Sequence, residues 1–126
     1  MKLRIKGNSL RLRISRSEMA SLIEIGNIQD TIQFAPAADA KLTYGLQHDS
    51  ATQDIRVEYQ PQRITVLLST ETAKRWAGSD EVGIYGSSET GSGVLELMVE
   101  KDFACLDGND PHDEDAFPNP NAGSAC

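Results

Sequence analysis

The chain has 126 residues, of which 39% are hydrophobic and 25% charged, a balance typical of one soluble globular domain. It contains only two cysteines, which argues against a disulfide scaffold, and no apolar run long enough to cross a bilayer. Its first residues alternate charges with aliphatic side chains, unlike a secretory signal, so we expect a cytoplasmic protein without a membrane partner.

The net charge is −7, and its distribution along the chain is uneven. Residues 1–50 carry seven basic and five acidic side chains, whereas residues 51–126 carry five basic and fourteen acidic ones. An acidic protein disfavours non-specific binding to nucleic acid, although a local basic patch can act against the overall charge.

The first half of the chain has the pattern of a hairpin, a helix and two further strands. Charged and aliphatic residues alternate up to Ile14, as in half-buried strands. Ser15 precedes Glu18 by three residues, the spacing of a capping box, and Gly26 is placed to end the helix. The expected elements are strands over 1–6 and 10–14, a helix over 15–26, strands over 31–34 and 41–46, and a linker over 47–53.

The same pattern restarts after the linker. At a constant offset of 54, Ser69 corresponds to Ser15 and Trp76 corresponds to Leu22, so we expect Trp76 to fill the core rather than to stack on a ligand. The expected elements are strands over 55–59 and 64–68, a helix that begins at Ser69 or Thr70 and ends at Gly78, a strand around 82–84, and a last strand over 94–99.

Each half has one apolar sheet face and one apolar helix stripe, and looks too small to enclose a core alone. We therefore predict an α+β fold, a small β-barrel built from two ββαββ repeats with pseudo-two-fold symmetry and an irregular acidic C-terminal tail. The expected domain covers residues 1–101, with repeat 1 over 1–46 and repeat 2 over 54–101, and the extension covers 102–126. A pair of repeats fused in this way is expected to be a monomer.

The run Gly7-Asn8-Ser9-Leu10-Arg11-Leu12-Arg13-Ile14, with its capped helix, resembles the AbrB/MazE (SpoVT-AbrB type) group of bacterial transition-state regulators and antitoxins. Over residues 1–100 this resemblance implies a swapped-hairpin barrel in which the family's dimer is fused in tandem. Ser15 and Ser69 stand where the family usually has proline, and the tail has no counterpart in it. As a whole, the chain resembles a functionally uncharacterised bacterial protein family.

Strand alternation places five cations on one side of the first hairpin, which we call the basic face: Lys2, Arg4, Lys6, Arg11 and Arg13. Like charges on paired strands destabilise a sheet, so an anion should offset them, either a polyanionic or protein partner or the protein's own acids. DNA phosphates are the alternative partner, because the resemblance implies that Lys6, Asn8, Arg11 and Arg13 contact DNA. On its matching side, the second hairpin carries only Arg56, Glu58, Arg63 and Thr65. A protein that binds a palindromic DNA site with two-fold symmetry would need basic residues on both hairpins.

The tail gathers thiols, an imidazole and carboxylates. Cys105, His112, Cys126 and Asp110 are ligands that zinc accepts, although their spacing matches no recognised Cys/His signature. The alternatives are a disulfide between the two cysteines, and a tail without metal that packs on the barrel through Phe103, Leu106 and Phe117. A further hypothesis is that the acidic tail folds over the basic face.

No arrangement in the sequence is typical of an enzyme. His48 and His112 lie near no nucleophile motif, and no glycine loop for phosphate is present. We therefore expect a non-catalytic bacterial binding module without a cofactor, which contacts a protein or another polyanion through the basic face. An AbrB/MazE-like DNA-binding regulator and a zinc-stabilised tail are the alternatives.

Overall fold

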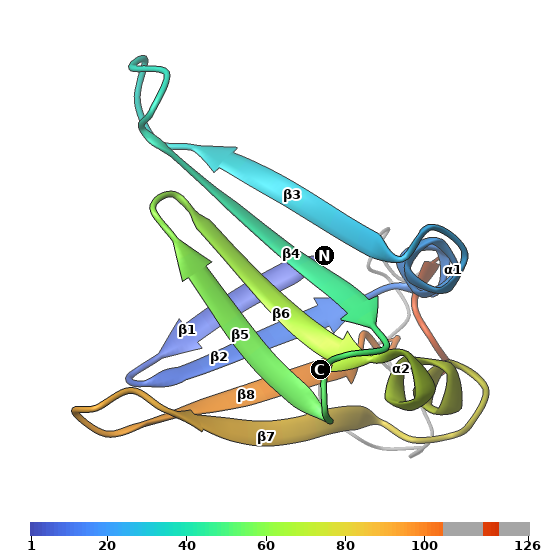
Figure 1. Cartoon of the computed structure of the whole chain (residues 1–126). Helices are drawn as coiled ribbons and strands as arrows, with labels where there is room; N and C mark the ends of the chain where they lie inside the picture. Colours follow the sequence, from blue (N-terminus) through green and yellow to red (C-terminus); the bar gives the residue numbers. More distant parts are fainter. Residues whose placement is uncertain (105–114, 119–126) are drawn as a thin grey trace.

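The computed structural model describes residues 1–104 and 115–118, and over this part the chain is α+β, as predicted (Figure 1). Its elements are β1 (Lys2–Lys6), β2 (Ser9–Ile14), α1 (Arg16–Ile25), β3 (Asn27–Gln33), β4 (Lys41–Asp49), β5 (Ile55–Gln60), β6 (Arg63–Ser69), α2 (Thr70–Ala77), β7 (Gly83–Glu89) and β8 (Val94–Lys101). The order β-β-α-β-β thus occurs twice.

The strands form two sheets of four, in the orders β1-β2-β8-β7 and β3-β4-β6-β5. The two central pairs, β2 with β8 and β4 with β6, are parallel, whereas the outer pairs are antiparallel hairpins. Each sheet therefore combines one hairpin from the first five elements with one from the second five. Strand pairing among the described residues closes no continuous barrel; two sheets face each other instead.

The core lies between the two sheets and under the two helices. The sheets lie close together near α1 and α2 and diverge toward the hairpin turns (Figure 1). Burial follows this shape, because Leu68 and Val66 are buried on β6, whereas Tyr59, near the turn on β5, is 73% exposed. Trp76 on α2 is fully buried, which confirms its predicted place in the core. The other fully buried large side chains are Leu12, Ile14, Leu22, Leu46, Leu68, Leu97, Val66 and Val99.

Both helices are capped by serines: Ser15 is the predicted cap of α1, and Ser69 is one of the two candidates for α2, the other being Thr70. Ser15 accepts from the backbone N–H of Glu18, whose carboxylate accepts from the N–H of Ser15 at 2.9 Å, so the predicted capping box is confirmed. Ser69 caps α2 by accepting from the N–H of Thr72 at 3.0 Å. Gly26 ends α1 with φ of 100°, a left-handed conformation that glycine adopts without strain.

Three strands extend beyond their predicted bounds by three residues or more at one end. β3 begins at Asn27, directly after the cap of α1, and β4 continues to Asp49, into the expected linker. Asp30 explains the missed start of β3, since it occupies the side of β3 that faces the sheet interior, where alternation calls for an apolar residue. β7 continues to Glu89, five residues beyond the strand expected around 82–84.

The two sheets meet along two different seams. At the β5–β7 seam, Ile55 packs directly on Gly86, where an added Cβ would lie 2.3 Å from Cγ2 of Ile55. β1 and β3 are the first and third strands of the first half, just as β5 and β7 are those of the second half. At the β1–β3 seam, the Met1 ammonium lies 3.2 Å from a carboxylate oxygen of Asp30. The β5–β7 seam is thus closed by tight apolar packing, whereas β1 and β3 are linked by an ion pair at the start of β1 and diverge toward their hairpin turns (Figure 1).

Candidate functional site: the basic face

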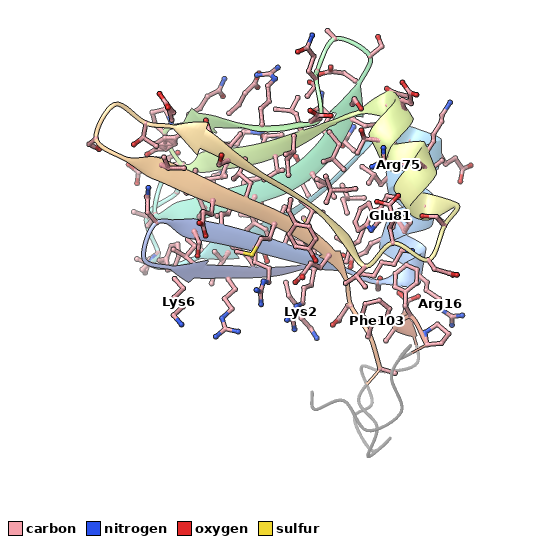
Figure 2. The ribbon with its side chains drawn as sticks, turned by 90° about the horizontal axis from the view of Figure 1, so that it is seen from below. Lys2, Lys6, Arg16, Arg75, Glu81 and Phe103 are labelled. Carbon is pink, nitrogen blue, oxygen red and sulfur yellow. The ribbon has the colours of Figure 1, made fainter. Side chains whose placement is uncertain are left out.

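The register of the first hairpin places all five cations of the basic face on the outer side of the sheet. Lys2 lies opposite Arg13, and Arg4 lies opposite Arg11. Figure 2 shows Lys2 and Lys6 extending from β1 away from the ribbon. Like charges directly opposite each other on paired strands destabilise the pair by some tenths of a kcal/mol, so the fate of each charge matters.

Glu100 of β8 offsets the two arginines of β2. Its Oε1 lies 3.1 Å from Nε of Arg11 and 3.6 Å from Nε of Arg13. Tyr85 of β7 donates to its Oε2 at 2.8 Å, and burial, together with this carboxylate, raises the pKa of Tyr85 to about 12. Nε of Arg11 is buried and makes no aligned hydrogen bond with a described residue, so its pairing with Glu100 is purely electrostatic.

The remaining three cations are those of β1, and only one of them has a partner of opposite charge in the described part of the chain. Lys2 pairs with Asp102 at 2.8 Å. Arg4 and Lys6 are exposed and form no ion pair with any described residue. Together with Ser9, Arg11 and Met98 they line a small hollow of about 120 Å³. This hollow offers three cationic side chains to one carboxylate, sulfate or phosphate group.

Asn8 has a structural contact at the turn of the first hairpin. Its side-chain amide donates to the backbone carbonyl of Val94 at 2.7 Å, and the backbone carbonyl of Asn8 accepts from the backbone N–H of Glu96 at 3.0 Å. The turn is thereby fastened to the start of β8, which leaves the amide of Asn8 engaged within the protein.

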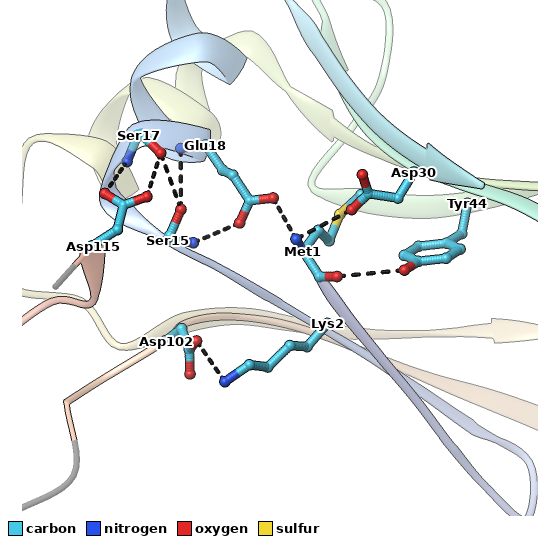
Figure 3. Close-up of polar contacts among 9 residues, drawn as sticks. All are labelled: Met1, Lys2, Ser15, Ser17, Glu18, Asp30, Tyr44, Asp102 and Asp115. Carbon is cyan, nitrogen blue, oxygen red and sulfur yellow. Dashed lines mark hydrogen bonds and ion pairs between the residues drawn. The ribbon is translucent and has the colours of Figure 1, made fainter. Parts of the chain in front are cut away.

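The start of β1 is held by the N-terminal ammonium (Figure 3). Met1 pairs with the carboxylates of Glu18 and Asp30, and its carbonyl accepts from the Tyr44 hydroxyl at 3.4 Å. Burial alone would lower the pKa of the Met1 ammonium, but Glu18 and Asp30 outweigh it and hold that pKa above its ordinary value of 8.0. These contacts tie β1 to α1 and β3.

Raising the pH should therefore weaken the fold. The pKa of the ammonium is higher in the folded state than in the unfolded state, so its contribution is complete below about pH 8 and is lost as the pH rises through the folded-state value. We expect the free energy of unfolding, measured by urea titration, to fall as the pH is raised above about 8.

A Glu18→Gln variant isolates the charge, because glutamine can still serve in the capping box. We expect it to lower the free energy of unfolding by about 1 kcal/mol at neutral pH and to flatten the alkaline decline. An unchanged alkaline decline in this variant would contradict the assignment to the ammonium.

The described part of the tail docks beside α1. Asp115 accepts from the N–H of Ser17 at 3.0 Å, and hydrogen bonds from Ser17 and Ser15 hold the pKa of the Asp115 carboxyl below its ordinary value (Figure 3). Phe117 packs edge-on against Phe103, with ring centroids 6.3 Å apart. Phe117 also packs against the hydrophobic core, as predicted for a docked tail, whereas Phe103 contacts Phe117. The third residue expected to dock, Leu106, lies outside the described residues.

The predicted zinc ligands all lie outside the part that the structure describes: Cys105, Asp110, His112 and Cys126. Within residues 1–104 and 115–118, no group of three His, Cys, Asp or Glu side chains is arranged to hold a metal ion. The two metal-free alternatives that involve these residues, a disulfide and a tail folded over the basic face, likewise stay predictions.

A larger hollow of about 540 Å³ lies between β5, α2 and β7. Of its three charged lining residues among those described, Arg75 and Glu81 form an ion pair at 2.8 Å, as Figure 2 shows, and the third is Asp54. His48 lies at the end of β4, with Nδ1 3.0 Å from the hydroxyl of Thr70, rather than in a linker. The other ring nitrogen of His48, Nε2, is buried without a hydrogen-bond partner among the described residues, so this His–Thr pair lacks the third group that orients a catalytic base. The basic face is therefore the stronger candidate.

Sequence reasoning missed the partners of the basic face, Glu100 and Asp102. The alternation in 94–99 could have placed Glu96 and Glu100 on the outer side of a strand. No local pattern could show that this strand pairs with β2, because the two are joined only by the fold.

A family model described as "Family of unknown function (DUF7009)" matches residues 1–121. Searches among curated proteins and among solved structures gave no match. Neither of the described helices has the length and apolar content needed to cross a membrane.

Proposed function

We propose that this chain, which belongs to the DUF7009 family of unknown function, is a non-catalytic binding module whose basic face contacts an acidic, polyanionic partner. One observation carries the proposal: Arg4 and Lys6 lie on a face crowded with like charge, without a carboxylate partner among the described residues. Among the residues that the structure describes, acidic side chains offset only the other cations of this face.

The uneven pairing gives the face a preferred point of contact. Glu100 offsets Arg11 and Arg13, and Asp102 offsets Lys2, whereas the hollow beside Arg4 and Lys6 is lined by no acid among the described residues. An external anion placed there would relieve the repulsion between Arg4 and Arg11, which face each other across β1 and β2. Charge-assisted hydrogen bonds from guanidinium and ammonium groups to such an anion are strong for their size.

A double variant, Arg4→Gln with Lys6→Gln, tests this proposal on a heparin column and by titration with heparin. We expect its affinity for heparin to be about tenfold weaker, because two exposed charge contacts of up to about 1 kcal/mol each are lost. The matched control is Lys41→Gln with Lys74→Gln, which removes the same charge from exposed sites elsewhere. Equal losses in both double variants would show that only net charge matters and would reject the proposal.

DNA binding of AbrB/MazE type is the alternative function. The combination of hairpins from both halves in each sheet supports it, since the resemblance implies interleaved hairpins. The charge on the second hairpin argues against it, because Arg56 pairs with Glu58 at 3.0 Å and Arg63 donates to Gln29 at 2.6 Å. Duplex DNA added to the same titrations separates the two: a DNA binder should show a steep salt dependence, with a slope that drops by about 2 in the Arg4/Lys6 variant.

A further inference from the structure

The first strand, β1, carries different side chains on its two sides, and one of its edges pairs with no strand within residues 1–104 and 115–118. β1 is the terminal strand of its sheet. Its outward side chains are the cations Lys2, Arg4 and Lys6, whereas Leu3 and Ile5 point inward, opposite Leu12 and Leu10 of β2. A strand laid along the free edge of β1 would therefore meet positive charge on one side and apolar surface on the other.

We infer that the free edge of β1 takes up an extended acidic strand from a protein partner, in which carboxylate side chains alternate with apolar ones. This inference rests on the proposed function and names its partner. Addition of a strand to a sheet edge is a common way to recognise peptides, in which the main chain gives affinity and alternate side chains give specificity.

Charge spacing supports the acidic side of such a strand. Side chains on one side of a strand recur about every 6.8 Å, so carboxylates at alternate positions match the separation of Lys2, Arg4 and Lys6. Lys2 already forms an ion pair with Asp102. Arg4 and Lys6 are the two cations of this row that have no carboxylate partner among the described residues. Two carboxylates two residues apart would complete it.

The apolar side of the strand would face the opening between β1 and β3. The two sheets diverge there toward the hairpin turns (Figure 1). Ile5 and Ile32, which lie on the inner sides of β1 and β3, are 59% and 46% exposed. Apolar side chains inserted between them would be removed from water together with both isoleucines.

The other edge strands lack this combination. The outward residues of β3 are uncharged, β5 presents Arg56 already paired with Glu58, and β7 is covered on its inner side by the packing of Ile55 on Gly86. A second copy of the chain is a poor occupant of the β1 edge, because pairing β1 with itself would bring its cations together. Charge complementarity therefore selects an acidic strand.

The test uses the full chain and a labelled nine-residue peptide in which glutamate alternates with valine, followed by fluorescence anisotropy. A peptide of the same composition with all glutamates before the valines is the control for charge alone. We expect the alternating peptide to bind at least about tenfold more tightly, since only it places both kinds of side chain correctly. Its binding should also slow amide hydrogen exchange at Leu3 and Ile5.

Charge-reversed variants complete the test. Arg4→Glu with Lys6→Glu should abolish binding of the alternating peptide, whereas Lys41→Glu with Lys74→Glu should leave it within about twofold, because those lysines lie elsewhere. Equal binding of both peptides, or unchanged exchange at Leu3 and Ile5, overturns the inference but leaves the proposed function intact if heparin binding still needs Arg4 and Lys6. Self-association through β1, detected as a dimer in solution, also overturns it.

Discussion

Replacement of Trp76 by alanine is expected to lower the free energy of unfolding by about 3–5 kcal/mol, a large part of the stability of a domain of this size. Trp76 is fully buried on the inner side of α2, in the same cluster as Leu22 and Leu68. Removing the indole leaves a cavity that the surrounding strands fill only in part. Urea titration followed by far-UV circular dichroism measures the loss.

Two other variants show whether the stability contributed by Trp76 comes from the volume of its side chain or from its indole nitrogen. Nε1 of Trp76 is buried and has no hydrogen-bond partner among the described residues, so Trp76→Phe breaks no hydrogen bond there and should cost less than half as much as alanine. Lys74→Ala, at an exposed position of the same helix, should change stability by less than about 0.5 kcal/mol. A phenylalanine variant as unstable as the alanine variant would contradict the packing argument.

The second large effect is expected from Gly86→Ala. A Cβ at this position would lie 2.3 Å from Cγ2 of Ile55, a branched side chain held at the β5–β7 seam, so the two strands must move apart. We expect the free energy of unfolding to fall by about 1–3 kcal/mol, although alanine normally suits a strand better than glycine.

Relief of the clash is the check on this prediction. In an Ile55→Ala background the methyl group added at position 86 has room, so Gly86→Ala should then cost less than about 0.5 kcal/mol, and the two changes should be strongly non-additive. Ser87→Ala, at the next and exposed position of β7, is the control. Additive effects of Gly86→Ala and Ile55→Ala would show that the seam does not depend on their contact.

Local sequence patterns predicted most helices and strands. The exact start of β3 and the arrangement of the two sheets depend on long-range contacts, which local patterns do not show. Ser15, Glu18 and Gly26 carry the start and end of α1 in their identities, so the helix could be placed from the sequence. The start of β3 could not be predicted, because Asp30 interrupts its apolar alternation. Asp30 pairs with the Met1 ammonium, which is distant in the sequence. The arrangement as two facing sheets also depends on parallel pairs between distant strands.

The basic face shows the same division. Alternation within β1 and β2 is a local property, so the shared side of Lys2, Arg4 and Arg11 could be predicted. Which of these charges are offset could not, because Glu100 and Asp102 reach the face only through the pairing of β8 with β2. The sequence therefore predicted the face, and the fold identifies Arg4 and Lys6 within it.

The mixing of hairpins from both halves in each sheet bears on how the chain acquires its structure during synthesis. A nascent chain that has emerged only to Asp49 contains β2 and β4 but neither of their parallel neighbours, so the inner sides of both hairpins stay in water. β8, which completes the first sheet, ends at Lys101. The native arrangement is therefore reached late, after most of the polypeptide has left the ribosome, and the early hairpins are the segments that a chaperone would need to shield.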